Sequence, residues 1–183
     1  MPKINKTKYA LLGLLSIGPM SGYDIKKFTD FSISYFWKEN FGHIYPVLKR
    51  MEEEGLVTKK VEKTEGKPNR NVYTITDSGK DELQGWLSVS PEEHSLRSEL
   101  LLKIFFGALT SKETIINMVR DEKERHEKRR EAFDSIEEMI MTQKGDDYQG
   151  DQPFWLITLR YGKKMSQAVT EWCDETIKIL SNL

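Results

Sequence analysis

The chain has 183 residues, a length that allows one compact domain or two small ones. Hydrophobic residues make up 38% of it and charged residues 31%, which is typical of a protein with an ordinary apolar core. The single cysteine, Cys173, excludes an intramolecular disulfide framework and fits a reducing cytoplasm. The apolar run at residues 9–15 is too short to cross a bilayer, and no signal-peptide cleavage site follows the basic residues 1–8. We therefore expect a cytoplasmic protein that does not associate with membranes.

The net charge of −1 is unevenly distributed along the chain. Residues 1–90 contain 14 lysines and arginines against 11 acidic residues, a balance of +3, whereas residues 91–183 contain 14 against 18, a balance of −4. The mildly basic first half is compatible with an anionic partner.

Two helices are predicted at the start of the chain. Residues 6–17 form a nearly all-round apolar helix that Gly18-Pro19 ends. Ser21-Gly-Tyr-Asp24 has the pattern of a capping box, with Ser21 as the N-cap and Asp24 reaching back to it. The helix that it opens should end near Thr29, and residues 31–41 are aromatic-rich and give no assignment.

A third helix is predicted between residue 42 or 43 and Gly55, the left-handed stop. Pro46 falls in its first turn, where a missing N–H costs little. Spacings of three and four residues place one apolar stripe toward the core and leave the opposite face to polar and aromatic groups. The stripe is Ile44, Val47, Leu48 and Met51, and the opposite face is Tyr45, Pro46, Lys49, Arg50 and Glu53.

A β-hairpin and a fourth helix follow. Residues 56–63 and 71–76 are β-branched runs with partial alternation, and residues 64–70 between them form a loop with two cations at its tip. Thr76 can cap a helix over residues 77–87. Three helices followed by a hairpin is the order of a winged helix-turn-helix domain, in which the hairpin must pack on the helices because an isolated hairpin is marginally stable.

The second half is predicted to be entirely helical after a polar linker at residues 88–93. The dense apolar run 96–109 should be buried on several sides, and Thr110-Ser-Lys-Glu113 resembles a capping box that opens a helix reaching about residue 143. A last helix should start at Pro153. Both long helices carry coiled-coil seams spaced 4,3,4,3, one from Ile115 to Ile140, with a polar middle at Glu122, His126 and Arg129, and one from Trp155 to Leu180.

These seams fit an antiparallel pair within one chain, a dimer that uses part of the same surface, or both. We therefore expect a mainly α protein with a small β-hairpin and two domains. Residues 1–88 form a winged helix-turn-helix DNA-binding domain, and residues 92–183 form a helical, coiled-coil-like dimerisation domain.

The sequence offers no sign of catalysis. His43, His94 and His126 fall in separate elements without metal-ligand spacing, and nucleophile-elbow, phosphate-loop and dinucleotide patterns are absent. Capping explains Ser21, and Cys173 lies on an apolar helix face as a small core residue would. We expect neither an enzyme nor a bound metal or cofactor.

Nucleic-acid recognition is better supported, because a helix that enters the major groove presents polar or aromatic groups from its first turns. His43, Tyr45 and Lys49 meet this requirement in the third helix. Each residue alone has an ordinary explanation, since Tyr45 could pack on the hairpin and Arg70 could be solvated, so the prediction depends on their convergence. The other candidates for contact with phosphates or the minor groove are Tyr23, Lys67, Asn69 and Arg70.

Five segments resemble the PadR family of bacterial transcriptional regulators in type and in order. They are Leu11-Leu-Gly-Leu-Leu15, Ser21-Gly-Tyr-Asp24, Ile44-Tyr-Pro-Val-Leu-Lys49, Glu54-Gly-Leu-Val57 and Tyr73-Thr-Ile-Thr-Asp-Ser-Gly79. The helical remainder resembles the C-terminal domain of the larger PadR subfamily by pattern more than by motif. The resemblance implies a winged-helix homodimer that binds a near-palindromic, double-stranded DNA operator and usually represses transcription.

Phe36-Trp37 ahead of Ile44-Tyr-Pro46 resembles the phenolic-acid-responsive branch of that family, in which a phenolic acid releases the repressor. A small aromatic effector would then lie between the domains, lined by Phe36, Trp37, Trp155 and Arg160. The alternative is that these are ordinary core aromatics. A rival from another class is a protein–protein interaction module that uses the winged helix and the long helices to assemble a complex without DNA.

Overall fold

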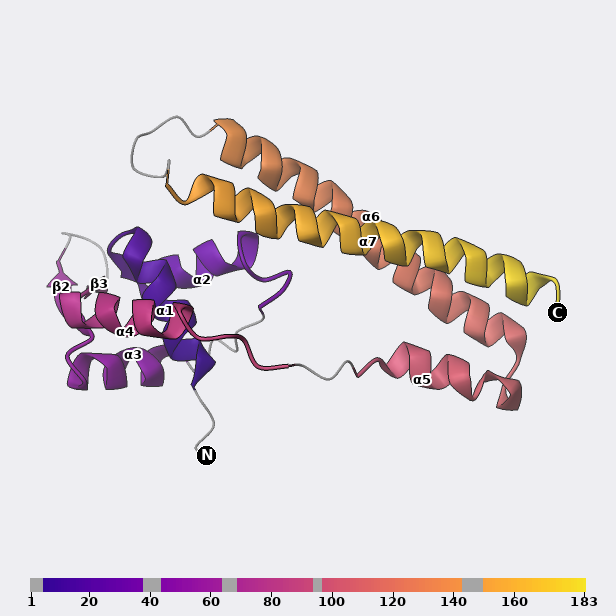
Figure 1. Cartoon of the computed structure of the whole chain (residues 1–183), viewed down its shortest axis with the longest axis horizontal. Helices are drawn as coiled ribbons and strands as arrows, with labels where there is room; N and C mark the ends of the chain where they lie inside the picture. The colour runs from indigo at the N-terminus through magenta and orange to yellow at the C-terminus, as the bar shows by residue number, and fades with distance from the viewer. Residues whose placement is uncertain (1–4, 38–43, 64–68, 94–96, 143–149) are drawn as a thin grey trace. The chain divides into compact units, whose positions relative to one another are not determined.

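The computed structural model describes residues 5–37, 44–63, 69–93, 97–142 and 150–183 (Figure 1). The chain forms two compact units, Met1–Glu92 and Glu93–Leu183. The first unit contains four helices and three strands among its described residues, and the second is helical. These elements confirm the predicted fold class, which is mainly α with a small β component. The first unit consists of α1 (Lys6–Ile17), β1 (Met20–Ser21), α2 (Gly22–Phe31), α3 (Ile44–Glu53), β2 (Val57–Glu62), β3 (Arg70–Ile75) and α4 (Asp77–Leu87).

The helix boundaries of the first unit follow the local signals in the sequence. α1 and α4 have the predicted bounds, and the side-chain oxygen of Thr76 accepts a hydrogen bond from the N–H of Gly79 at the start of α4. α2 opens on the predicted capping box but runs to Phe31, two residues beyond the predicted end at Thr29. The strand signals for β2 and β3 are also confirmed to within one residue at each end.

The sheet has three strands in the order β1-β3-β2 rather than the two of the predicted hairpin. β1 is a two-residue strand in which Met20 lies opposite Tyr73 and Ser21 opposite Val72, antiparallel to β3. Two residues are too few to show an alternating pattern, so this strand carries no sequence signal. It connects the start of α2 directly to the hairpin of β2 and β3, which we call the wing.

The core of the first unit lies where α1, α3 and the sheet meet. Side chains from every helix except α4 are fully buried there, which explains why an otherwise marginal hairpin is held in place. Of the predicted stripe on α3, Ile44, Leu48 and Met51 are buried and Val47 is half-buried. The buried members of this core are Leu11, Leu12, Leu14, Leu15, Ile25, Ile44, Leu48, Met51, Leu56, Val57 and Tyr73.

α3 ends in a Schellman motif at Gly55, which confirms the predicted left-handed stop. Gly55 has a φ of 72°, and its N–H donates to the carbonyl of Glu52 at 3.1 Å, while the N–H of Leu56 donates to the carbonyl of Met51 at 2.9 Å. Pro46 is the third residue of α3, which confirms its place in the first turn. The two signals together fix both ends of the third helix.

The second unit consists of α5 (Glu99–Phe105), the 3-10 helix η2 (Gly107–Leu109), α6 (Lys112–Thr142) and α7 (Gln152–Ser181). Figure 1 shows α6 and α7 side by side along most of their length, as an antiparallel pair. The predicted seams meet in this pair: Val119 and Phe133 of α6 and Leu159 and Cys173 of α7 are all buried. The intramolecular pairing of the long helices is therefore present.

A polar layer interrupts the seam at His126. Its Nδ1 lies 3.2 Å from the hydroxyl of Ser166 on α7, and its Nε2 lies 3.2 Å from a carboxylate oxygen of Glu122 on α6. Partial burial and then the charge of Arg129 lower the pKa of His126, and the attraction of Glu122 does not offset them. The imidazole is therefore held in its neutral form more strongly than a free histidine would be.

Two predictions for the second unit are wrong. The apolar run that includes α5 is not buried within the chain: Phe105 is 80% exposed and Leu109 is 88% exposed. The cap of α6 is Ser111 rather than Thr110, because the side-chain oxygen of Ser111 accepts the N–H of Thr114 at 3.2 Å.

None of the helices in the described part of the chain combines the length and apolarity needed to span a bilayer.

Candidate nucleic-acid interface

The first two turns of α3 present a polar and aromatic face away from the core. Tyr45 is 59% exposed, and Pro46, Lys49 and Arg50 are also exposed. Lys49 Nζ lies 3.8 Å from a carboxylate oxygen of Glu53 one turn later, and both side chains are well exposed, so water screens this pair and leaves the lysine available. Glu53 itself lies about 12 Å along the helix axis from Tyr45, at 1.5 Å per residue. The first turn of α3 thus contains no acidic residue.

The start of α2 is locked by a complete capping box. The N–H of Asp24 donates to the hydroxyl oxygen of Ser21 at 3.3 Å, and the N–H of Ser21 donates to Asp24 Oδ2 at 2.8 Å. The Ser21 hydroxyl also lies 2.8 Å from the same carboxylate oxygen. Tyr23, in the first turn, is 69% exposed. The box therefore orients a tyrosine outward at a helix N-terminus.

Asp24 also connects α2 to the wing. Arg70, the first residue of β3, donates from its guanidinium to Asp24 Oδ2, and the arginine side chain remains about half exposed. Partial burial raises the pKa of Asp24, but hydrogen bonds from Ser21 and Arg70 outweigh that effect and hold the pKa below its usual value. The carboxylate is thus charged at neutral pH and joins three elements, β1, α2 and β3.

α3 and the start of α2 meet at Tyr45. Its ring lies directly over Gly22, the first residue of α2. The structure thus brings Tyr45 next to the residue that precedes Tyr23, and since both tyrosines are exposed we infer that these two residues from different helices belong to one surface. We call this surface, formed by Tyr23, Tyr45 and Lys49, the tyrosine face.

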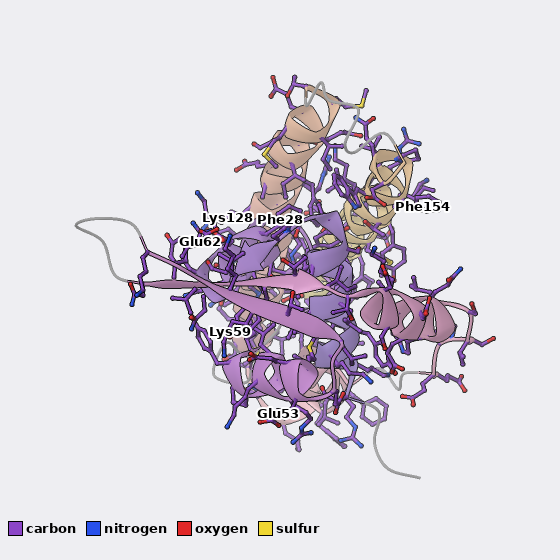
Figure 2. All side chains as sticks on the ribbon, turned by 90° about the vertical axis from the view of Figure 1, so that its left-hand side faces the viewer. Phe28, Glu53, Lys59, Glu62, Lys128 and Phe154 are labelled. Atoms are coloured by element: carbon purple, nitrogen blue, oxygen red, sulfur yellow. The ribbon has the colours of Figure 1, made fainter. Side chains whose placement is uncertain are left out.

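The wing contributes cations that the sequence analysis did not single out. Lys60 on β2 and Lys63 just after it are exposed. Lys59, labelled in Figure 2, instead donates a hydrogen bond from its Nζ to a carboxylate oxygen of Glu52 on α3 at 2.8 Å. Alternation along β2 was a usable signal, because Lys60 must point to the face opposite Lys59. Asn69 at the base of the loop is exposed. The predicted residues His43 and Lys67 lie outside the described part of the chain.

The predicted effector residues come from both units. In the first, Phe36 is exposed and packs edge-to-face against Tyr35, with the two ring centroids 4.7 Å apart. Trp37 is half-buried. In the second, Trp155 is half-buried near the start of α7, and Arg160, further along the same helix, is exposed. None of the four is in a fully buried core.

Among the described residues, no group of three or more His, Cys, Asp or Glu side chains is placed to hold a metal ion.

Comparisons with known proteins agree with this architecture. Residues 11–85 match the Transcriptional regulator PadR-like family, and residues 96–181 match the Virulence activator alpha C-term family. The negative transcriptional regulator PadR of Bacillus subtilis is 33% identical over 135 residues, which cover 73% of this chain and 74% of that protein.

Solved structures of the same Bacillus subtilis protein are similar over nearly the full chain. Its complex with operator DNA matches with a TM-score of 0.84 at 26% identity and covers 97% of this chain and 99% of that one. Its complex with p-coumaric acid matches with a TM-score of 0.74 at 26% identity, covering 95% and 94%. The relatives are regulators and not enzymes, and the winged-helix fold with C-terminal helices is shared. The chain belongs to the PadR-like family of transcriptional regulators.

Proposed function

We propose that the protein is a homodimeric repressor whose first unit binds a near-palindromic DNA operator and whose binding is released by a small aromatic acid. The observation that carries the proposal is the tyrosine face, whose two α3 residues, Tyr45 and Lys49, point outward from a helix whose opposite side is fixed in the core. The relatives support it: one is named a negative regulator, and its structure has been solved with operator DNA.

On this proposal α3 enters the major groove with Tyr45 and Lys49 toward the base edges. Tyr23 contacts the adjacent phosphate through its hydroxyl, and Asn69 on the wing contacts the next stretch of backbone. Arg70 remains a candidate because a guanidinium has five N–H donors, and the bond to Asp24 uses only part of them. His43 and Lys67 stay in the set as predictions from sequence.

The dimer is supported by apolar surface that the second unit leaves uncovered. Along α7 an exposed stripe, spaced three and four residues apart, lies roughly a third of a turn around the helix from the buried seam. α5 has no buried residue at all. Such apolar surface is uncommon on a monomer, and a second copy of the chain would cover it. The stripe on α7 is Phe154, Ile157, Tyr161 and Met165, and the exposed residues of α5 and its C-terminal extension are Leu101, Leu102, Phe105, Phe106 and Leu109.

We propose a division of labour along the chain, with residues 1–88 binding DNA and residues 92–183 forming the dimer. Two-fold symmetry would place the two copies of α3 about one duplex turn apart, roughly 34 Å, or a multiple of that distance. The operator would therefore contain two inverted half-sites at matching spacing. Affinity should fall steeply with salt, because each phosphate contact releases a counterion.

The effector proposal is narrower and depends on four residues. Phe36, Trp37 and Trp155 offer aromatic surface that is not fully buried, and the exposed guanidinium of Arg160 could pair with a carboxylate. The similar Bacillus subtilis structure holds p-coumaric acid, a phenolic acid of this kind. Tryptophan fluorescence titrated with p-coumaric acid tests this part. A wild-type signal that the acid does not change, or a response to the acid that Arg160→Ala does not alter, would contradict it.

The experiment for the whole proposal is a footprint on the DNA upstream of the protein's own gene, at low salt and with a panel of phenolic acids. We expect one protected region with two half-sites, lost when an active phenolic acid is added. A dimer that protects no DNA would contradict the proposal and favour a protein–protein interaction module.

A further inference from the structure

We propose that Gly22 is a positioning residue for the operator contact made by Tyr45. The absent side chain of Gly22 leaves the space in which the Tyr45 ring lies, and that space fixes where the tyrosine hydroxyl meets DNA. The inference rests on the proposed DNA-binding function, because Tyr45 matters here only as a contact to the operator.

The geometry of the contact leaves no room for a side chain on Gly22. A Cβ atom built on this residue would lie 2.7 Å from Cε1 of Tyr45, 2.9 Å from Cζ and 2.9 Å from the hydroxyl oxygen. Carbon atoms in van der Waals contact are about 3.5–4.0 Å apart. The outer half of the tyrosine ring therefore occupies the volume that any larger residue at this position would need.

The backbone at Gly22 gives no other reason for a glycine. Among the described residues only Gly55 has a φ in the left-handed region, so an L-residue could adopt the conformation of Gly22 without strain. Glycine is also a weak helix former compared with alanine, and Gly22 is the first residue of α2. Gly22 is buried, and the atoms closest to its missing side chain all belong to Tyr45. Space for the ring is thus the role that remains.

Both sides of the contact are fixed except the ring. Gly22 follows Ser21, which pairs with Val72 in the sheet and caps α2, so its Cα cannot shift easily. Tyr45 follows Ile44, which is buried in the core, so the start of α3 is equally fixed. The ring itself is 59% exposed and can swing outward. Since the obstructing atoms are the end of a side chain, a methyl group at Gly22 should displace the ring and leave both helices in place.

The test is a double-mutant cycle on operator affinity, using the footprinted duplex and fluorescence anisotropy with the full chain. Gly22→Ala should weaken operator binding about tenfold, the size expected for one lost hydrogen bond to a base or phosphate. In a Tyr45→Ala background the same Gly22→Ala change should have no further effect, because the ring is gone. Gly13→Ala is the matched control, since nothing lies within 4 Å of a Cβ at Gly13 of α1.

Two results would overturn the inference. One is Gly22→Ala binding the operator as the wild type does. The other is an equal loss of affinity in the wild-type and Tyr45→Ala backgrounds, which would mean that residue 22 acts on DNA without the tyrosine. Thermal melts of all variants check that the first unit still folds.

A readout without DNA separates this inference from the proposed function. The protein is labelled with 3-fluorotyrosine, and the ¹⁹F resonance of Tyr45 is identified by its absence in Tyr45→Phe. We expect Gly22→Ala to shift this resonance and Gly13→Ala to leave it unchanged. If the wild type binds no DNA, the proposed function fails while the shift still decides where the ring lies; an unshifted resonance overturns the inference in either case.

Discussion

The substitution Asp24→Asn removes the charge at the junction of β1, α2 and β3. In the wild type, Oδ2 of Asp24 accepts the N–H of Ser21 at 2.8 Å, lies 2.8 Å from the Ser21 hydroxyl and accepts the guanidinium of Arg70. Weakening a helix N-terminal box costs about 1 kcal/mol. The ion pair adds only a few tenths of a kcal/mol, because the arginine is half exposed to water. We expect a total loss of about 1–1.5 kcal/mol, or roughly 4–12 °C in the Tm of a unit of this size.

The stability lost in Asp24→Asn should depend on pH, and the lowered pKa of Asp24 gives the direction of that dependence. Although partial burial opposes it, hydrogen bonding from Ser21 and Arg70 holds the pKa of Asp24 below its value in the unfolded chain. A lowered pKa stabilises the fold above the unfolded value, near pH 4, and this stabilisation is lost as the pH falls through the folded value. The wild type should therefore be more stable than Asp24→Asn at neutral pH, and the difference should shrink in acid.

Urea denaturation followed by circular dichroism, at pH 7 and at steps toward pH 3.5, measures both effects. Asp77→Asn is the matched control, because Asp77 is also a first-turn aspartate with a cationic neighbour, Lys80 at 2.9 Å, but is almost fully solvated. If Asp24→Asn loses no more stability at pH 7 than Asp77→Asn does, the assignment of Asp24 as the junction between α2 and the wing is wrong.

Three further predictions concern other parts of the chain. Gly79→Ala should destabilise the first unit by about 2 kcal/mol in urea denaturation, because its Cβ would collide with the backbone carbonyl oxygen of Leu56; an unchanged midpoint would refute this. Phe105→Ser should give a folded monomer in sedimentation velocity with helicity retained, whereas a persistent dimer would show that α5 lies outside the interface. For His126, burial and then Arg129 lower the pKa, so stability should fall as the pH drops from 7.5 to 5.5; a fall of equal size in His126→Gln would assign it to other groups.

The parts of the fold that the sequence predicts are those with local signals. Gly18-Pro19 and the Thr76 cap mark the ends of α1 and α4 to the residue, and the Schellman glycine Gly55 marks the end of α3. The 4,3 spacing of the seams identifies which faces of α6 and α7 meet, because it places the seam residues of each helix on one side. In each case a few neighbouring residues contain the whole signal.

What the sequence does not predict depends on contacts between distant residues or between chains. The apolar residues of α5 indicate burial but not the partner that provides it, and within one chain they remain exposed. The hydrogen bond from Arg70 to Asp24 joins residues 46 positions apart in the sequence. The contact of the Tyr45 ring with Gly22 depends on how α2 and α3 pack together. Periodicity and capping patterns describe single elements, so they place Tyr45 on an outer face without showing what it touches.

The central claim is that the tyrosine face reads an operator, and the most direct measurement is the ratio of affinities for the operator and for a scrambled duplex. Tyr45→Ala should bring this ratio about tenfold closer to one, because a base contact contributes discrimination. Lys60→Ala on the wing should weaken binding to both duplexes alike and leave the ratio unchanged, as a phosphate contact does. A Tyr45→Ala protein that discriminates as well as the wild type would contradict the claim.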